Sequence, residues 1–130
     1  MKRTAIELEK LATDPAIGFR ITEKTKAERE VGLALEALGE VQDISREPSG
    51  KADFIDSEGQ KWDVKAYQSY LFKSNQNQIA EMIKSIQKSL SEQENVMIDT
   101  RGLSKTDFTT LQHFVLAENL SQLVKFWPLS

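Results

Sequence analysis

Two short apolar runs flank a polar turn near the middle of the chain and limit the folds that it can adopt. The runs read ADFID at residues 52–56 and KWDVKAY at residues 61–67, and SEGQ lies between them. Runs of this length on either side of a glycine-containing turn predict a β-hairpin with Gly59 in the turn. The strands of such a hairpin should pack one face against a core, yet these strands carry Asp53, Asp63 and Lys65.

Helical periodicity and further short apolar runs complete the expected fold. Helices are predicted over residues 4–12, 25–39, 75–90 and 104–120, the last with Ser104 as its N-cap. Additional strands are predicted over residues 40–45, 95–99 and 123–127, with a loop over 46–51. The resulting α-α-β-β-β-α-β-α-β order favours an α/β fold with a mixed central sheet flanked by helices.

Composition restricts both the organisation of the chain and its chemistry. A chain of 130 residues, 39% hydrophobic and 28% charged, fits one globular domain, in which residues 1–23 form a peripheral N-terminal segment. No apolar run has the length of a membrane span, and the N-terminus lacks the apolar core of a signal peptide. The absence of cysteine excludes disulfides, thiolate zinc sites and thiol catalysis.

Charged residues on the hairpin suggest a metal site. Alternation along a strand puts Asp63 and Lys65 on one side of the sheet, and Asp53 can join them from across the hairpin. Two adjacent carboxylates repel unless a divalent cation lies between them, and oxygen ligands suit Mg²⁺ first, with Mn²⁺ or Zn²⁺ as alternatives. Such a metal could activate water to attack a phosphodiester, while Lys65 orients or deprotonates that water.

These residues resemble the motif of the PD-(D/E)xK nucleases, which have the restriction-endonuclease-like fold. The motif is AD at Ala52 and Asp53 followed by DVK at residues 63–65, so alanine replaces the family's proline. The resemblance extends over about residues 26–100. It implies an α-β-β-β-α-β core and a metal-dependent endonuclease in which Asp53 and Asp63 bind the metal and Lys65 serves the attacking water.

A helical glutamate is the fourth candidate for this site. The stretch AEREVGLALEALG is similar to a helix of archaeal Holliday-junction resolvases, in which a glutamate completes the metal site. The matching residue is Glu28, which we rank above Glu30. A capping interaction is the alternative, because TKAE at residues 25–28 has the form of a capping box in which Glu28 bonds back to Thr25.

A narrower resemblance suggests a biological context. GKADFIDSEGQKWDVKAY, with MIDTRGLS later in the chain, resembles the C-terminal toxin nuclease domains of contact-dependent growth inhibition and related polymorphic toxin systems. This likeness implies a monomer that a secreted or cell-surface effector delivers into the cytoplasm of target bacteria, and a cognate immunity protein that neutralises it. We expect RNA as the substrate, with tRNA favoured. The alternatives are a toxin, repair or defence DNase that is resolvase-like, and an inactive module that binds nucleic acid or protein.

Two more side chains are candidates for substrate contact. Gln68 follows the motif lysine, and Arg101 stands at the end of a neighbouring strand, where a guanidinium can clamp phosphate. A surface ion pair is an equally good interpretation of Arg101. Asp63 and Lys65 also have a structural alternative, an exposed pair worth less than about 1 kcal/mol.

Overall fold

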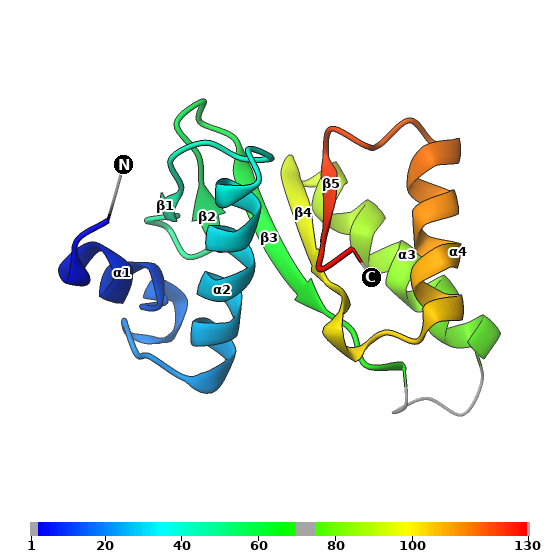
Figure 1. The fold of residues 1–130 in the computed structure, drawn as a ribbon, viewed down its shortest axis with the longest axis horizontal. Coiled ribbons are helices and arrows are strands. Elements are labelled where there is room, and N and C mark those ends of the chain that lie inside the picture. The colour runs from blue at the N-terminus through cyan, green and yellow to red at the C-terminus, as the bar shows by residue number, and fades with distance from the viewer. Residues whose placement is uncertain (1–2, 70–74, 130) are drawn as a thin grey trace. The chain divides into compact units, whose positions relative to one another are not determined.

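The computed structural model describes residues 3–69 and 75–129. Over these residues the chain is α/β, with four α-helices and five strands of mixed direction in the order β1-β2-β3-β4-β5 (Figure 1). The predicted α/β class with a mixed sheet is therefore confirmed. The chain divides into two compact units, Met1–Asp63 and Val64–Ser130, and the strand β3 (Lys61–Ala66) runs from one into the other.

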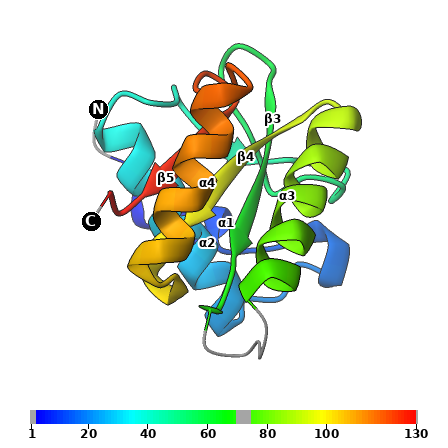
Figure 2. The same ribbon diagram turned by 90° about the vertical axis from the view of Figure 1, so that its right-hand side faces the viewer.

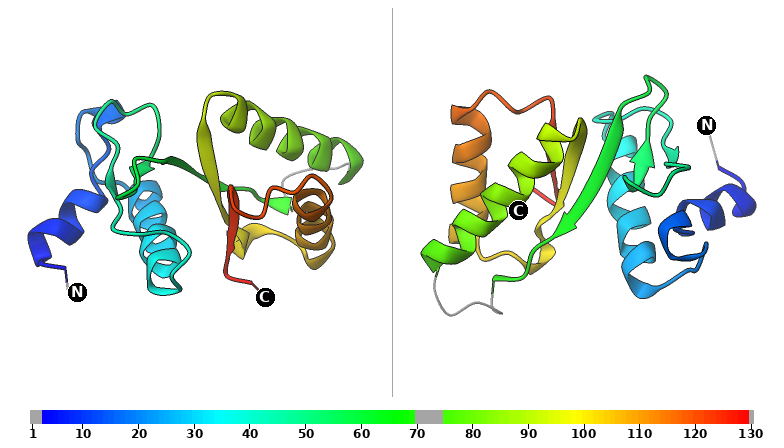
Figure 3. Two further views of the ribbon diagram at one scale, coloured as in Figure 1. Left: turned by 90° about the horizontal axis from the view of Figure 1, so that it is seen from above. Right: turned by 180° about the vertical axis from the view of Figure 1, so that it is seen from behind.

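The first unit places two helices against an antiparallel hairpin (Figure 3). Its elements are α1 (Ala5–Leu11), a 3₁₀ turn (Pro15–Ile17), α2 (Glu23–Ala37), β1 (Ser45–Arg46), β2 (Phe54–Ile55) and the start of β3. In the antiparallel register Phe54 faces both Arg46 and Trp62. Buried apolar side chains from α2, the segment before β1 and the hairpin form its core: Val31, Leu35, Ile44, Phe54 and Trp62.

The predicted hairpin is confirmed, and one carboxylate organises its turn. Asp56 Oδ1 accepts hydrogen bonds from the N–H groups of Glu58 and Gln60 at 2.9 and 3.0 Å. Its Oδ2 accepts from Trp62 Nε1 at 2.9 Å. Gly59 has φ +82°, in the left-handed region that glycine adopts without strain.

The helix α2 begins earlier than predicted, and this removes one interpretation of Glu28. Its N-cap is Thr22, whose side chain accepts from the Thr25 N–H at 3.1 Å. Thr25 Oγ1 in turn accepts from the Thr22 N–H at 2.8 Å, which completes a reciprocal box. The predicted capping of Thr25 by Glu28 is therefore wrong, because Thr25 already lies inside the first turn.

The predicted strand over residues 40–45 is largely wrong. Only Ser45 of this run is in a strand, together with Arg46, which the sequence had suggested to be in a loop. Val41 and Ile44 are buried three residues apart, a spacing that does not match the two-residue period of a strand. Asp43, which lies between them, has φ +46°, so the chain turns here instead of extending.

The second unit packs two helices with a parallel strand pair (Figure 2). Its elements are α3 (Asn75–Ser91), β4 (Glu94–Asp99), a 3₁₀ turn (Thr100–Gly102), α4 (Lys105–Ala117) and β5 (Val124–Trp127). All four predicted elements are confirmed, and Ser104 caps α4 by accepting from the Asp107 N–H at 3.1 Å. The core consists of apolar residues from all four elements: Met82, Ile86, Val96, Ile98, Leu111, Val115 and Val124. Among the described residues, no helix has the length and apolar character that crossing a bilayer requires.

Candidate functional site

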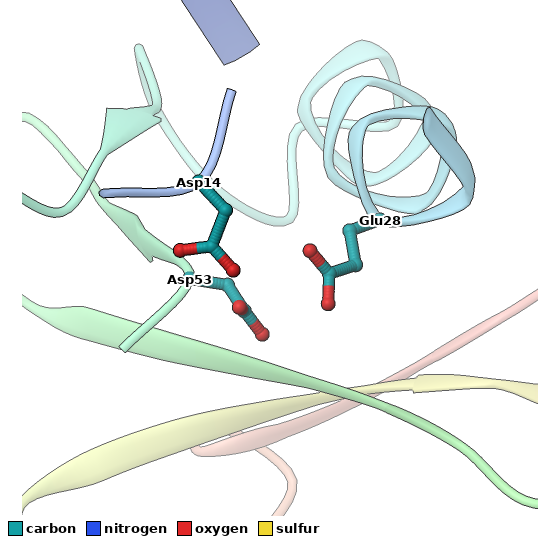
Figure 4. Close-up of side chains that lie close together, drawn as sticks. All are labelled: Asp14, Glu28 and Asp53. Carbon is teal, nitrogen blue, oxygen red and sulfur yellow. The ribbon is translucent and has the colours of Figure 1, made fainter. Parts of the chain in front are cut away.

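Three carboxylates from separate segments meet in the first unit. Asp14 precedes the 3₁₀ turn, Glu28 lies on α2 and Asp53 precedes β2. One carboxylate oxygen from each residue lies within 4.8 Å of those of the other two. Figure 4 shows the three side chains converging. We call Asp14, Glu28 and Asp53 the acidic cluster.

A buried arginine lies against two members of this cluster. Arg46 Nη2 is 2.9 Å from Glu28 Oε1, and its Nη1 is 3.5 Å from Asp53 Oδ1. The side chains of Arg46 and Glu28 are only 7% and 6% exposed, so water screens this pair weakly. The guanidinium therefore neutralises part of the negative charge and fixes the positions of both carboxylates.

Backbone contacts hold the same arginine in place. Arg46 Nε donates to the Leu11 carbonyl at 2.8 Å, and Nη2 approaches the Thr25 carbonyl at 3.5 Å. The guanidinium carbon lies 4.8 Å from the centroid of the Phe54 ring, a cation–π distance. Arg46 thus connects the end of α1, the first turn of α2 and the hairpin.

A closed loop positions Asp14. Its N–H donates to the Arg20 carbonyl at 3.3 Å, and its own carbonyl accepts from the Phe19 N–H at 2.9 Å. Its Oδ1 accepts from the Ala16 N–H at 2.9 Å. Asp14 follows the first helix and precedes Pro15, and no local pattern in the sequence indicates that its carboxylate belongs to a site.

An irregularity in the hairpin positions Asp53. Phe54 faces Trp62 in the register, yet the Asp53 N–H also donates to the Trp62 carbonyl, at 2.9 Å. Two consecutive residues thus oppose one, which is the arrangement of a β-bulge. Bulges redirect side chains, and Asp53 occupies one of these two positions, with its carboxylate close to that of Glu28 on α2.

Burial dominates the electrostatics of Glu28. Desolvation raises the pKa of Glu28 above its ordinary value, and the charge on Asp14 adds to the rise. The hydrogen bond and the charge of Arg46 lower that pKa, but they do not outweigh burial. A cation bound beside Glu28 would favour the ionised form, and three carboxylates are the oxygen ligands that Mg²⁺ and Mn²⁺ prefer.

The structure brings together two of the four residues that the sequence assigned to the site. Glu28 and Asp53 are both in the acidic cluster. Asp63 lies on β3, where it is half-buried, and it is not a member of this cluster. Lys65 is half-buried two residues further along the same strand. The proposed roles of Asp63 as a ligand and of Lys65 beside the attacking water stay predictions.

The two candidates for substrate contact both lie in the second unit. Arg101 forms a two-pronged ion pair with Asp99, with Nε and Nη2 each 2.9 Å from a carboxylate oxygen, and it lies over the Trp127 ring. The ion pair that the sequence suggested as an alternative is therefore present, and phosphate contact stays a prediction. The Gln68 side chain is half-buried and packs against Gly102. The contact is so close that a Cβ built on Gly102 would lie 2.5 Å from Gln68 Oε1.

Comparisons with known proteins identify no relative. The chain matches no protein family, no curated protein and no solved structure.

Proposed function

We propose that this chain is a metal-dependent endonuclease that hydrolyses phosphodiester bonds. The observation that supports the proposal best is the meeting of Glu28 and Asp53, both expected from the sequence to bind metal, with a third carboxylate from Asp14. The three residues come from separate segments of the chain. Grouping like charges beside the buried Glu28 costs free energy, which Arg46 offsets only in part. A bound divalent cation would offset the repulsion among the three carboxylates.

The motif residues on β3 supply the rest of the proposed chemistry. Asp14, Glu28 and Asp53 would hold the ion, with Asp63 as a further ligand, and a divalent metal supplies Lewis acidity toward water and phosphate. The Lys65 amine would orient the attacking water and donate to the charged phosphoryl oxygens. Asp63 and Lys65 are alternate residues of one strand, so their side chains leave it on the same side.

The finer proposals follow from the resemblance in the sequence. We propose the restriction-endonuclease-like core and a toxin domain of contact-dependent growth inhibition, delivered into target bacteria and neutralised by an immunity protein. We favour RNA, and tRNA first, because a net charge of -3 suits a compact structured substrate better than long duplex DNA. A DNase of the same fold is the alternative.

One observation favours a second candidate function, a module that binds without catalysis. Arg46 already pairs with Glu28 and Asp53 inside the unit, so these carboxylates also have a structural partner. A fold that had lost its chemistry could keep them for this ion pair alone. The two candidates differ in whether the cluster binds metal and whether the chain cleaves nucleic acid.

Cleavage assays with matched variants test the proposed function. The purified chain and its Asp53→Asn, Asp63→Asn and Lys65→Ala variants would be incubated with total bacterial RNA and with plasmid DNA, each with Mg²⁺, Mn²⁺, Zn²⁺ or EDTA. Glu58→Gln is the control, because it removes an exposed carboxylate from the hairpin turn. We expect metal-dependent cleavage that falls by about a hundredfold or more in the three site variants and persists in the control.

Each outcome decides between specific alternatives. Discrete cleavage of RNA supports the tRNA nuclease, and nicked plasmid moves the proposal to DNA. Full activity of Asp63→Asn would remove Asp63 from the site. An equal loss in Glu58→Gln would show that the activity does not depend on this site. No cleavage of either substrate with any of the three metals would favour the binding module.

A further inference from the structure

We propose that the guanidinium of Arg101 binds one unpaired nucleobase by stacking, and that the chain therefore binds single-stranded segments of its substrate. The inference deepens the proposed function and rests on it in one respect, that the chain binds nucleic acid. It assigns to Arg101 a contact with a base in place of a contact with phosphate.

Strand pairing brings three residues of the second unit together. The parallel register of β4 and β5 puts Asp99 directly beside Trp127, and each is the last residue of its strand. In the 3₁₀ turn that follows β4, the Arg101 N–H donates to Asp99 Oδ1 at 3.0 Å. The Arg101 side chain then contacts both strand ends, and its guanidinium carbon lies 5.0 Å from the centroid of the Trp127 ring. We call Asp99, Arg101 and Trp127 the stacking site.

The ion pair with Asp99 occupies an edge of the guanidinium that could otherwise grip phosphate. Nε and Nη2 donate to the two oxygens of Asp99, each at 2.9 Å. Arginine binds phosphate through the same two-pronged geometry. A phosphate at this edge would have to displace a carboxylate that is 9% exposed and separate it from its counter-charge. The carboxylate also cancels the charge of Arg101, so the stacking site attracts phosphate only weakly.

The flat face of the guanidinium suits a base better. The group lies over the Trp127 ring at a cation–π distance, and the Arg101 side chain is still 38% exposed. Planar guanidinium groups stack on aromatic rings and on nucleobases. Asp99 and the ring fix the orientation of this one, which reduces the entropy lost when a base binds. Bases within a duplex already stack on their neighbours, so the stacking site selects unpaired bases.

Two other roles for Arg101 predict different results. A phosphate contact depends on charge, so lysine would largely replace arginine, and loss of the charge would reduce the slope of log K against log salt by about 0.7. A purely structural ion pair would leave the affinity for nucleic acid unchanged. Stacking depends on the planar group, so lysine should fail to replace it while the salt dependence stays the same.

Fluorescence anisotropy with two labelled single strands of equal length tests the inference. One is oligoadenylate RNA, and the other has the same phosphates but abasic residues. The wild type, Arg101→Lys and Arg101→Gln would be titrated in EDTA to prevent metal-dependent cleavage. Lys105→Gln is the control, because it removes an exposed positive charge from the start of α4. Circular dichroism verifies that each variant is folded.

We expect the wild type to bind the strand with bases more tightly than the abasic strand. Both Arg101 variants should bind the strand with bases about tenfold more weakly than the wild type does. Their affinity for the abasic strand and their salt dependence should not change. Lys105→Gln should keep the preference for bases.

Several results would overturn the inference. They are a wild type that binds both strands equally or neither, an Arg101→Lys protein that binds the strand with bases as tightly as the wild type, or the same loss of preference in Lys105→Gln. Arg101→Lys keeps a cation beside Asp99, so it decides even where Arg101→Gln does not fold. If neither variant folds, the preference of the wild type decides.

Failure of the proposed function would look different. In that case the strand with bases is preferred and Arg101→Lys weakens its binding, but neither RNA nor DNA is cleaved with any metal. Conversely, metal-dependent cleavage by a protein that binds both strands equally would retain the nuclease and remove the role of Arg101.

Discussion

The two partners of the buried ion pair should respond unequally to neutralisation. Arg46→Gln leaves the buried Glu28 and the half-buried Asp53 without the charge of Arg46, with Asp14 nearby, and it also removes the Nε donor to the Leu11 carbonyl. Removing one partner of a buried pair costs about 3–5 kcal/mol. We expect a loss in this range in the free energy of unfolding.

Glu28→Gln should cost much less. The amide oxygen still accepts a hydrogen bond from Arg46, and Arg46 keeps its contact with Asp53. Burial raises the pKa of Glu28, so the folded protein already disfavours the charge that this substitution removes. The expected loss is about 1 kcal/mol or less. The two variants should therefore differ by roughly 2–4 kcal/mol, about 30-fold to 1,000-fold in the folding equilibrium.

Urea unfolding with a reporter in the first unit measures this difference. Trp62 is 2% exposed and is one of two tryptophans, so a Trp127→Phe background makes it the only source of tryptophan fluorescence. The measurement would be made in EDTA. It requires that the free energy of unfolding falls with urea concentration at the same slope in all variants. Equal losses for Glu28→Gln and Arg46→Gln, or a larger loss for Glu28→Gln, would refute the reasoning.

Three further predictions concern stability elsewhere. Burial alone would raise the pKa of Glu36, but hydrogen bonds from Arg3 and the Ile44 N–H lower it below its ordinary value. The ionised Glu36 therefore contributes to the free energy of unfolding above about pH 4.5, and this contribution is lost as the pH falls through the folded pKa. Glu36→Gln should reduce this loss in acid unfolding titrations. Gly32→Ala places a Cβ 2.7 Å from Ile44 Cδ1, so overpacking should exceed the gain in helix propensity and lower stability by about 1–2 kcal/mol in urea unfolding. Ser104→Ala removes the cap of α4 and should cost about 1 kcal/mol in urea unfolding followed by circular dichroism.

Local patterns were sufficient to predict most elements of the fold. The helices α3 and α4 have strong apolar periodicity or a clear cap, and the hairpin has a turn that Asp56 and Gly59 favour locally. These signals depend on neighbours within a few residues. The prediction of residues 40–45 failed because it relied on apolar content, whereas Val41 and Ile44 are buried three residues apart around a turn.

The site could be predicted only in part, because long-range contacts decide it. Glu28 has the right spacing from Thr25 for a capping box, but Thr22 competes for the cap and Arg46 provides Glu28 with a buried partner. Asp14 lies in the cluster only because the folded loop after it brings the chain back to α2. A motif of short spacing identified Asp53, whereas no local pattern connects Asp14 or Arg46 with it.

The contacts of Arg46 also have a consequence for folding kinetics. Its partners Glu28, Thr25 and Leu11 lie 18, 21 and 35 residues before it in the chain. The guanidinium can satisfy them only after both helices have reached the hairpin, so these bonds should form after the folding transition state. Substitutions at Arg46 should therefore accelerate unfolding and leave the refolding rate nearly unchanged. Arg46 would then affect how long the first unit stays folded more than how fast it folds.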